Sequence, residues 1–221
     1  MRLDEIRDPR SYRALMEERP QDDVAAAMPQ QIAALRDSTQ PVWIFAYGSL
    51  IWDPGFSYAQ AEPALLRGYH RSFCLYSYDY RGTPAQPGLI LGLDRGGSCR
   101  GMALLLPPDT LRQAIDRIWW REMSGRRVYD ARLLPVQTRS SSLKALGFTV
   151  LRDCPDYAGG LPLDNAARLI LSAVGRRGRC RDYFESTVRH LERLDLLDRP
   201  LRRLAERVEM LAALQDTHAG V

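Results

Sequence analysis

The clearest hydrophobic pattern begins at residue 42, where the mostly apolar run VWIFAY continues without a polar interruption. A continuous apolar, β-prone run predicts a strand that is covered on both faces. Similar runs follow, and turn-forming clusters such as RGTPAQPG and DRGGS lie between them. The further predicted strands are RSFCLYSY, GLILGL, RGMALLL, ARLLPVQT and ALGFTVLR.

Helical periodicity dominates the rest of the chain. One clear amphipathic helix is predicted from about Thr110 to Glu122, and the pattern after Pro162 is helical to the end. Residues 1–40 also have a helix-favouring composition, which prolines interrupt and Pro41 closes. We therefore predict a helical N-terminal extension over 1–40 and a main domain over 41–221. Strands first and helices later indicate an α+β domain with a curved or barrel-like sheet.

Composition narrows the classes of partner. The chain has 221 residues, 45% of them hydrophobic, which is enough for one sizeable core. Its 31 basic and 27 acidic residues nearly balance, so the charge does not favour nucleic acid. We interpret the one dense basic run, GRRGRCR, as a solvated loop between helices. No apolar run approaches the roughly 18 residues of a membrane span, and we expect no membrane association.

The cysteines and histidines do not form ligand-spaced groups. The four cysteines, Cys74, Cys99, Cys154 and Cys180, are far apart in the sequence, and so are the three histidines. We therefore expect no metal site, and no nucleotide-binding glycine motif or serine elbow is present. The first residues, MRLDEIRDPRSY, are charged throughout and do not have the apolar core of a signal peptide. We therefore expect reduced thiols in a cytoplasmic protein.

Glu122 is the first candidate for chemistry. It falls on the same predicted helix face as Leu111, Ile115 and Ile118. One interpretation is a last-turn residue at the rim, or one paired with a buried arginine. The other is a carboxylate at the edge of a cavity, where loss of water raises the pKa and gives a general base near neutral pH.

The second candidate is the turn at Gly48 and Ser49, where an apolar strand breaks and the apolar sequence LIW resumes at once. We expect a positive φ at Gly48, which lets successive backbone N–H groups converge on an anion, with the Ser49 hydroxyl and the Tyr47 phenol beside them. A β-bulge or barrel corner also favours glycine. Ser49 as a covalent nucleophile is a lesser alternative, because no histidine or lysine base is near in sequence.

Several motifs agree in order with one known family. FAYGSLIW, DYRGTPAQPG, WREM, CPDYAGGLPL and VGRRGRCRDYFESTVRHL occur within about residues 41–197. Together they resemble the ChaC-like glutathione-specific γ-glutamylcyclotransferases. The resemblance implies a small mixed β-barrel flanked by helices. It also implies conversion of the γ-glutamyl group of glutathione into 5-oxoproline with release of Cys-Gly, without a metal or organic cofactor.

The resemblance also assigns site residues by position. Glu122 in WREM falls on the family's catalytic glutamate, and the amides of Gly48 and Ser49 would hold the substrate α-carboxylate. The implied substrate-binding residues are Ile44, Phe45, Ala46, Tyr47, Gly48, Ser49, Leu50 and Tyr129.

Substrate range is the remaining question. A site that contacts the Cys-Gly half as well would prefer glutathione, and we expect the loop from Arg81 to Gly88 to form that wall. The alternatives are a cyclotransferase for other γ-glutamyl dipeptides or γ-glutamyl amines, and a binding module that senses an anion without catalysis. The oligomeric state does not follow from the sequence.

Overall fold

The structure, a computed structural model, describes residues 28–123 and 127–219. Its helices are α3 (Gln30–Arg36), α4 (Leu111–Met123), α5 (Leu163–Ser172), α6 (Cys180–Arg193) and α7 (Arg199–Ala219). Its strands are β1 (Val42–Ala46), β2 (Gln60–Ser77), β3 (Gly88–Leu106), β4 (Tyr129–Thr138), β5 (Ser142–Val150), β6 (Val174–Gly175) and β7 (Gly178–Arg179). Short 3₁₀ turns are η2 (Ser49–Ile51) and η3 (Pro108–Thr110).

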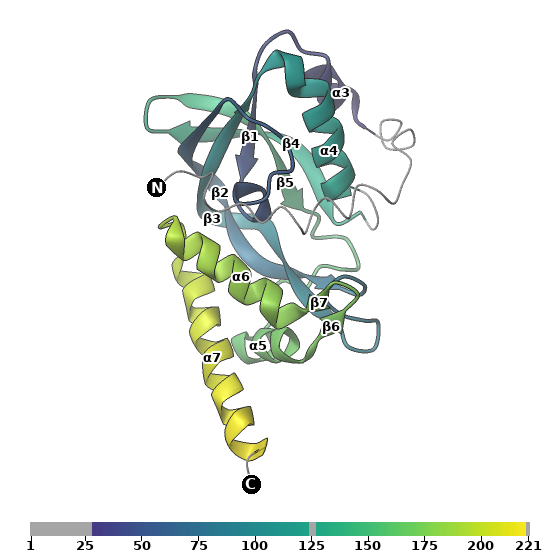
Figure 1. Ribbon diagram of the computed structural model, residues 1–221, viewed down its shortest axis with the longest axis vertical. Helices are drawn as coiled ribbons and strands as arrows, with labels where there is room; N and C mark the ends of the chain where they lie inside the picture. Colours follow the sequence, from purple (N-terminus) through teal and green to yellow (C-terminus); the bar gives the residue numbers. More distant parts are fainter. Residues whose placement is uncertain (1–27, 124–126, 220–221) are drawn as a thin grey trace. The chain divides into compact units, whose positions relative to one another are not determined.

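Five strands close into a barrel in the order β1-β3-β2-β4-β5 (Figure 1). β1 pairs antiparallel with β3, where Ala46 lies opposite Met102, and parallel with β5, where Ile44 lies opposite Leu146. β1 therefore has a paired strand on both edges, and the side chains of Ile44 and Phe45 are completely buried. The predicted α+β class with a small mixed β-barrel is confirmed.

Two strand boundaries differ from the predictions. DRGGS was expected to be a turn, but β3 runs through it, with φ values of 103° at Gly96 and 68° at Gly97. Glycine tolerates these left-handed conformations, so the strand bends there without ending. β2 begins at Gln60, well before the predicted start at Arg71. The prediction missed this first part because most of its residues are half-exposed or exposed and form no continuous apolar run.

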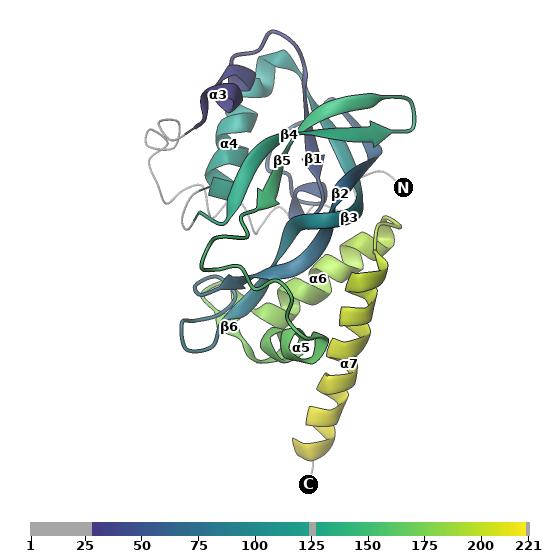
Figure 2. The same ribbon diagram turned by 180° about the vertical axis from the view of Figure 1, so that it is seen from behind.

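The chain divides into two compact units. The first contains the chain up to Tyr69 together with Gly96–Thr149, and includes β1, α4 and β4. Within it, α3 lies beside α4 (Figures 1 and 2), and Arg36 donates a 2.9 Å hydrogen bond to Asp116. Most of the proposed extension, residues 1–27, lies outside the described residues, so the boundary at residue 40 stays a prediction.

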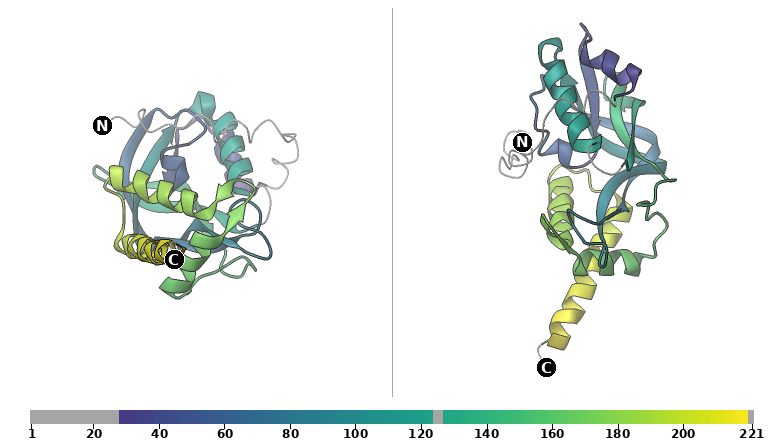
Figure 3. Two further views of the ribbon diagram at one scale, coloured as in Figure 1. Left: turned by 60° about the horizontal axis from the view of Figure 1, so that its bottom comes forward. Right: turned by 90° about the vertical axis from the view of Figure 1, so that its right-hand side faces the viewer.

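The second unit contains His70–Arg95 and Val150–Val221. The predicted C-terminal helices are present, and α6 buries the side chains of Phe184, Thr187, Val188 and Leu191. α7 continues past α5 toward the C-terminus (Figure 3). The basic run was expected to be a plain loop, but part of it pairs as the two-stranded hairpin β6–β7.

Candidate active site

The turn after β1 is a buried 3₁₀ turn. Ile51 N–H donates to the Gly48 carbonyl at 2.9 Å, and Asp53 N–H donates to the Ser49 carbonyl at 2.8 Å. Leu50 and Ile51 return into the core, which explains why the apolar pattern resumes at once. Gly48 has φ −138°, so the predicted positive φ at this residue is wrong.

The close approach of β3 to β1 occurs just before this turn. A β-carbon at Gly101 would stand 2.5 Å from the Ala46 carbonyl oxygen and 2.9 Å from the Phe45 ring. Such contacts are shorter than atoms tolerate, so glycine at 101 lets β3 lie tightly against the end of β1. The turn is therefore carried on a rigid strand.

Two arginines of α4, one helical turn apart, bind the segment that follows β1. Arg117 Nη1 donates to the Gly55 carbonyl at 2.9 Å, and Arg121 Nη1 donates to the Asp53 carbonyl at 2.5 Å. Arg121 Nη2 also donates to the Ser49 hydroxyl at 2.6 Å. Charge-assisted bonds of this kind are short and directional, so α4 fixes the position of the turn.

Glu122 follows Arg121 in the last turn of α4. Its side chain is 15% exposed, and its Oε1 is 3.4 Å from Arg121 Nε. Burial raises the pKa of Glu122 above its usual value, and the charge of Arg121 opposes this effect in part. A raised pKa makes a carboxylate a stronger base than an exposed glutamate, which suits a group that accepts and returns a proton. The structure therefore pairs Glu122 with an arginine and shields it from water, and its role as a general base stays a prediction.

The remaining predicted site residues are distributed along the strands. Ile44, Phe45 and Ala46 are completely buried in β1, and Tyr47 and Leu50 are almost completely buried beside the turn. Tyr129 opens β4 and is 8% exposed. Residues 44–50 are continuous along β1 and the turn, and the contact of these positions and of Tyr129 with a ligand stays a prediction.

Sequence reasoning missed Arg121. The sequence analysis gave Arg121 no role, although the structure joins it to both Ser49 and Glu122. The available signal was a pair of arginines four residues apart, Arg117 and Arg121, directly before the buried carboxylate. Nothing in that signal identifies the partners, since Ser49 and Asp53 are distant in sequence.

The loop motifs of the second unit have structural partners. Arg176 binds the Asp79 carboxylate through two nitrogens, at 3.0 Å and 2.8 Å, and the guanidinium groups of Arg176 and Arg177 stack on the Tyr80 ring at 4.8 Å and 4.6 Å. Arg81 donates to the Arg177 carbonyl at 2.6 Å. The basic run thus holds one end of the proline- and glycine-rich loop in place. The role of that loop as a wall for the Cys-Gly half stays a prediction.

The CPDYAGG motif is held by a buried acid in the same unit. Tyr157 donates to Asp94 at 2.8 Å, and Arg152 Nε donates to the other Asp94 oxygen at 2.7 Å. Burial disfavours the charged form of Asp94, but these hydrogen bonds outweigh it and hold the pKa of Asp94 below its usual value. The tyrosine of this motif therefore anchors the segment after β5.

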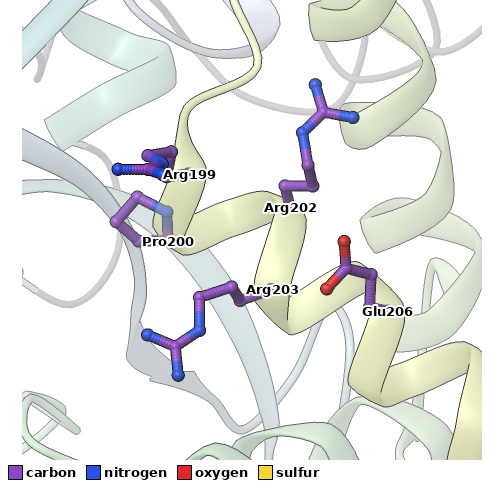
Figure 4. Close-up of a pocket in the computed structure, with 5 residues that line it drawn as sticks. All are labelled: Arg199, Pro200, Arg202, Arg203 and Glu206. Atoms are coloured by element: carbon purple, nitrogen blue, oxygen red, sulfur yellow. The ribbon is translucent and has the colours of Figure 1, made fainter.

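A surface hollow of about 550 Å³ lies at the start of α7, where it is lined by Arg199, Pro200, Arg202, Arg203 and Glu206 (Figure 4). The side chains of Arg202 and Arg203 point in different directions and do not converge on one point (Figure 4). This arrangement gives no geometry for binding one small anion, and none of the predicted site residues lines the hollow.

Over residues 28–123 and 127–219, no group of three or more histidine, cysteine or acidic side chains is arranged to hold a metal ion. In the same part of the chain, no helix has the length and apolar character needed to cross a membrane. The four cysteines are free thiols, and Cys74, Cys99 and Cys180 are buried.

Comparison with known proteins identifies the family. A sequence model of the family described as ChaC-like protein matches residues 42–211, which span the barrel, the turn, Glu122 and most of the C-terminal helices. The chain belongs to the ChaC-like family. The resemblance drawn from the motifs is confirmed.

ChaC-like relatives from distant organisms match most of the chain. A glutathione-specific γ-glutamylcyclotransferase of Escherichia coli is 34% identical over 81% of this chain and 78% of its own length. A glutathione-specific γ-glutamylcyclotransferase 1 of Homo sapiens is 30% identical over 65% of this chain and 67% of its own. The names of both relatives describe action on a small molecule.

A solved structure supports the ChaC-like fold. The crystal structure of a γ-glutamyl cyclotransferase specific to glutathione from yeast superposes with a TM-score of 0.69, covers 77% of this chain and 96% of its own, and is 21% identical. At this identity the likeness concerns the fold, and it agrees with the mixed barrel described above.

Proposed function

We propose that this chain cleaves glutathione by cyclising its γ-glutamyl group, giving 5-oxoproline and Cys-Gly. The observation that carries the proposal is the placement of Glu122, a buried carboxylate with a raised pKa, beside the Ser49 turn through Arg121. The names of the relatives support the choice of glutathione.

The turn is proposed to bind the amino-acid end of the substrate. Ser49 and the amides of Gly48 and Ser49 hold the α-carboxylate, and Tyr47 and Tyr129 stand beside the γ-glutamyl chain. The first N–H groups of a helical turn lack acceptors within the turn, which suits an anion. Ile44–Ala46 and Leu50 keep this turn in position from below.

The reaction needs a free amine, but the α-amine of the substrate is mostly protonated at neutral pH. Glu122 takes one proton from the ammonium group. The amine nitrogen then attacks its own γ-carbonyl carbon, and a five-membered ring forms. Glu122 returns this proton to the cysteine nitrogen as the C–N bond breaks. The ring nitrogen loses a second proton as it becomes the lactam N–H, and that proton passes to the departing amine, so Cys-Gly leaves as an ammonium ion. Water is neither consumed nor released in this sequence.

Much of the rate is expected to come from positioning. The amine and the carbonyl are already on one molecule, so holding its folded conformer removes most of the entropic barrier. Tyr47 or Tyr129 is suited to donate to the oxyanion that develops on the γ-carbonyl oxygen. No step in this scheme requires a metal ion or an organic cofactor.

The hydrogen bond from Arg121 to Ser49 argues against the serine as a nucleophile. A hydroxyl oxygen that accepts from a guanidinium has one of its two lone pairs engaged and is less nucleophilic, and an arginine does not remove a proton from it. An intramolecular cyclisation, in contrast, needs no covalent enzyme intermediate. We further propose a cytoplasmic location, which suits a protein whose cysteines are free thiols.

The test is incubation of the purified chain with reduced glutathione, followed by separate assays for 5-oxoproline and Cys-Gly. The two products are expected in equal amounts. Release of free glutamate instead would mean hydrolysis and would contradict cyclisation. Binding of glutathione without either product would support a sensing module. Turnover of γ-glutamyl dipeptides but not glutathione would support the alternative substrate class.

A further inference from the structure

Arg121 makes three contacts that converge on the proposed site. One nitrogen donates to the Ser49 hydroxyl, a second donates to the Asp53 carbonyl, and Nε lies 3.4 Å from the Glu122 carboxylate. The side chain is 13% exposed, so these contacts are made largely away from water. The contacts use different nitrogens of one planar group, so the guanidinium ties the turn to the carboxylate.

We propose that Arg121 is the positioning residue of this site, which aims the Ser49 hydroxyl proton at the substrate carboxylate and keeps Glu122 in its ionised, proton-accepting form. The inference rests on the proposed function, because it assigns the parts that Ser49 and Glu122 play in that reaction.

The first half of the proposal follows from hydrogen-bond chemistry. A serine hydroxyl has one proton to donate and two lone pairs to accept with. Arg121 has donors only, so in the 2.6 Å contact the Ser49 oxygen must be the acceptor. The hydroxyl proton then points elsewhere and remains available to a carboxylate oxygen of the substrate. Donation from a charged group also polarises the hydroxyl and strengthens it as a donor.

The second half follows from charge. Burial disfavours the carboxylate form of Glu122, and among the described residues Arg121 is the charged group that acts against this effect. When Glu122 takes the substrate proton, its attraction to Arg121 disappears. The bonds to Ser49 and Asp53 remain and hold the guanidinium in place. Glu122 can therefore change its charge twice in each turnover without the site losing its shape.

Lysine is not equivalent to arginine in this position. A lysine ammonium carries the same charge but has no planar fork, so it does not reach the Ser49 oxygen, the Asp53 carbonyl and Glu122 in one fixed geometry. Arg121→Lys therefore separates the two roles, because it retains the positive charge beside Glu122 and loses the hydrogen bond that orients the Ser49 hydroxyl. Arg121→Gln removes both.

Steady-state kinetics of these two variants against pH, with glutathione as substrate, test the proposal. For Arg121→Lys we expect KM to rise roughly tenfold, while the acid limb of kcat/KM stays within about 0.3 pH unit of wild type. For Arg121→Gln we expect the same rise in KM, with the acid limb displaced to higher pH by about one unit. The matched control is Arg112→Gln, which removes an exposed arginine of the same helix that pairs with Asp37 and not with the segment after β1. It should leave both quantities near wild type.

A second measurement does not depend on turnover. Carboxyl ¹³C NMR of the Glu122 side chain, assigned with Glu122→Gln, gives its pKa directly in each variant. Arg121→Gln should raise the Glu122 pKa by about one unit relative to wild type, and Arg112→Gln should not. Thermal melting identifies a variant that fails to fold, and Arg121→Lys then takes its place in the KM comparison.

The outcomes separate this inference from the proposed function. Wild-type protein that makes no 5-oxoproline from glutathione contradicts the function, while the NMR titration still decides whether Arg121 holds Glu122 ionised. Folded Arg121→Gln protein with an unchanged Glu122 pKa, or folded Arg121→Lys protein with a wild-type KM, overturns the assignment of Arg121. A shift in Arg112→Gln equal to that in Arg121→Gln overturns it as well, since the effect would then belong to the charge of the helix and not to the contact.

Discussion

The hydroxyl of Ser49 accepts a 2.6 Å hydrogen bond from Arg121, a residue 72 positions later in the chain. This bond joins the turn after β1 to the end of α4 and brings the Ser49 hydroxyl and the Glu122 carboxylate to one guanidinium. A binding element and a proton carrier on two separate secondary-structure elements thereby acquire a fixed relation.

The role of Glu122 predicts the effect of Glu122→Gln. The amide keeps the size of the side chain but cannot accept the substrate proton, so turnover should fall by a factor of about 100 or more. The affinity for glutathione should change much less. Initial rates of 5-oxoproline formation and a binding isotherm measure the two effects. Glu209→Gln, the same change at an exposed position of α7, is the control.

Stability distinguishes lost chemistry from lost folding in this variant. The folded-state pKa of Glu122 lies above its unfolded value, so the folded protein binds the proton more tightly. The contribution of Glu122 to stability is therefore lost as the pH rises from its unfolded-state pKa through its folded-state pKa. Glu122→Gln should accordingly melt at or above the wild-type temperature at pH 8. A large drop in the melting temperature would mean that the loss of turnover reports misfolding.

The pH dependence of wild-type activity follows from the same shift. The reaction needs ionised Glu122, and burial raises the pKa of this group in spite of Arg121. We expect kcat/KM to fall on the acid side with an apparent pKa above the ordinary glutamate value of about 4.3. A profile of kcat/KM from pH 4.5 to 9 measures it. Activity that stayed constant down to pH 4.5 would remove a raised carboxyl pKa from the mechanism.

The role of Ser49 as an anchor predicts a graded loss in Ser49→Ala. Removal of one hydrogen bond to a charged group should raise KM for glutathione roughly tenfold and change kcat by a smaller factor. A covalent nucleophile would behave differently, because its removal would nearly abolish turnover at saturating substrate. Ser57→Ala, an exposed serine in the same segment, is the control.

Substrate comparison tests the specificity of the proposed function. If the site also contacts the Cys-Gly half, that remote binding energy helps to orient the amine and the carbonyl. We expect a higher kcat/KM for reduced glutathione than for γ-glutamyl-alanine, and poor turnover of the bulkier oxidised glutathione. One 5-oxoproline assay with the three compounds is sufficient. Equal turnover of γ-glutamyl-alanine would contradict glutathione specificity and leave cyclisation intact.

Local sequence determined the elements that carry the site. The apolar run of β1, the glycine and serine that end it, and the helical face that presents Glu122 all depend on neighbours within a few residues. Periodicity and turn chemistry act over that range, so these features are legible in the chain. The motif order added the family and its reaction.

Only the tertiary structure decided how those elements are joined. The positive φ expected at Gly48 is absent, because the chain leaves β1 through a 3₁₀ turn that its own backbone bonds complete. The turn expected at DRGGS is a bend within β3, since Gly96 and Gly97 absorb the unusual φ values while the strand continues. The sequence does not identify Ser49 as the partner of Arg121, because their contact exists only once barrel closure and the packing of α4 bring distant segments together. Backbone preferences are local, whereas side-chain partners across 72 positions are set by the packing of the whole unit.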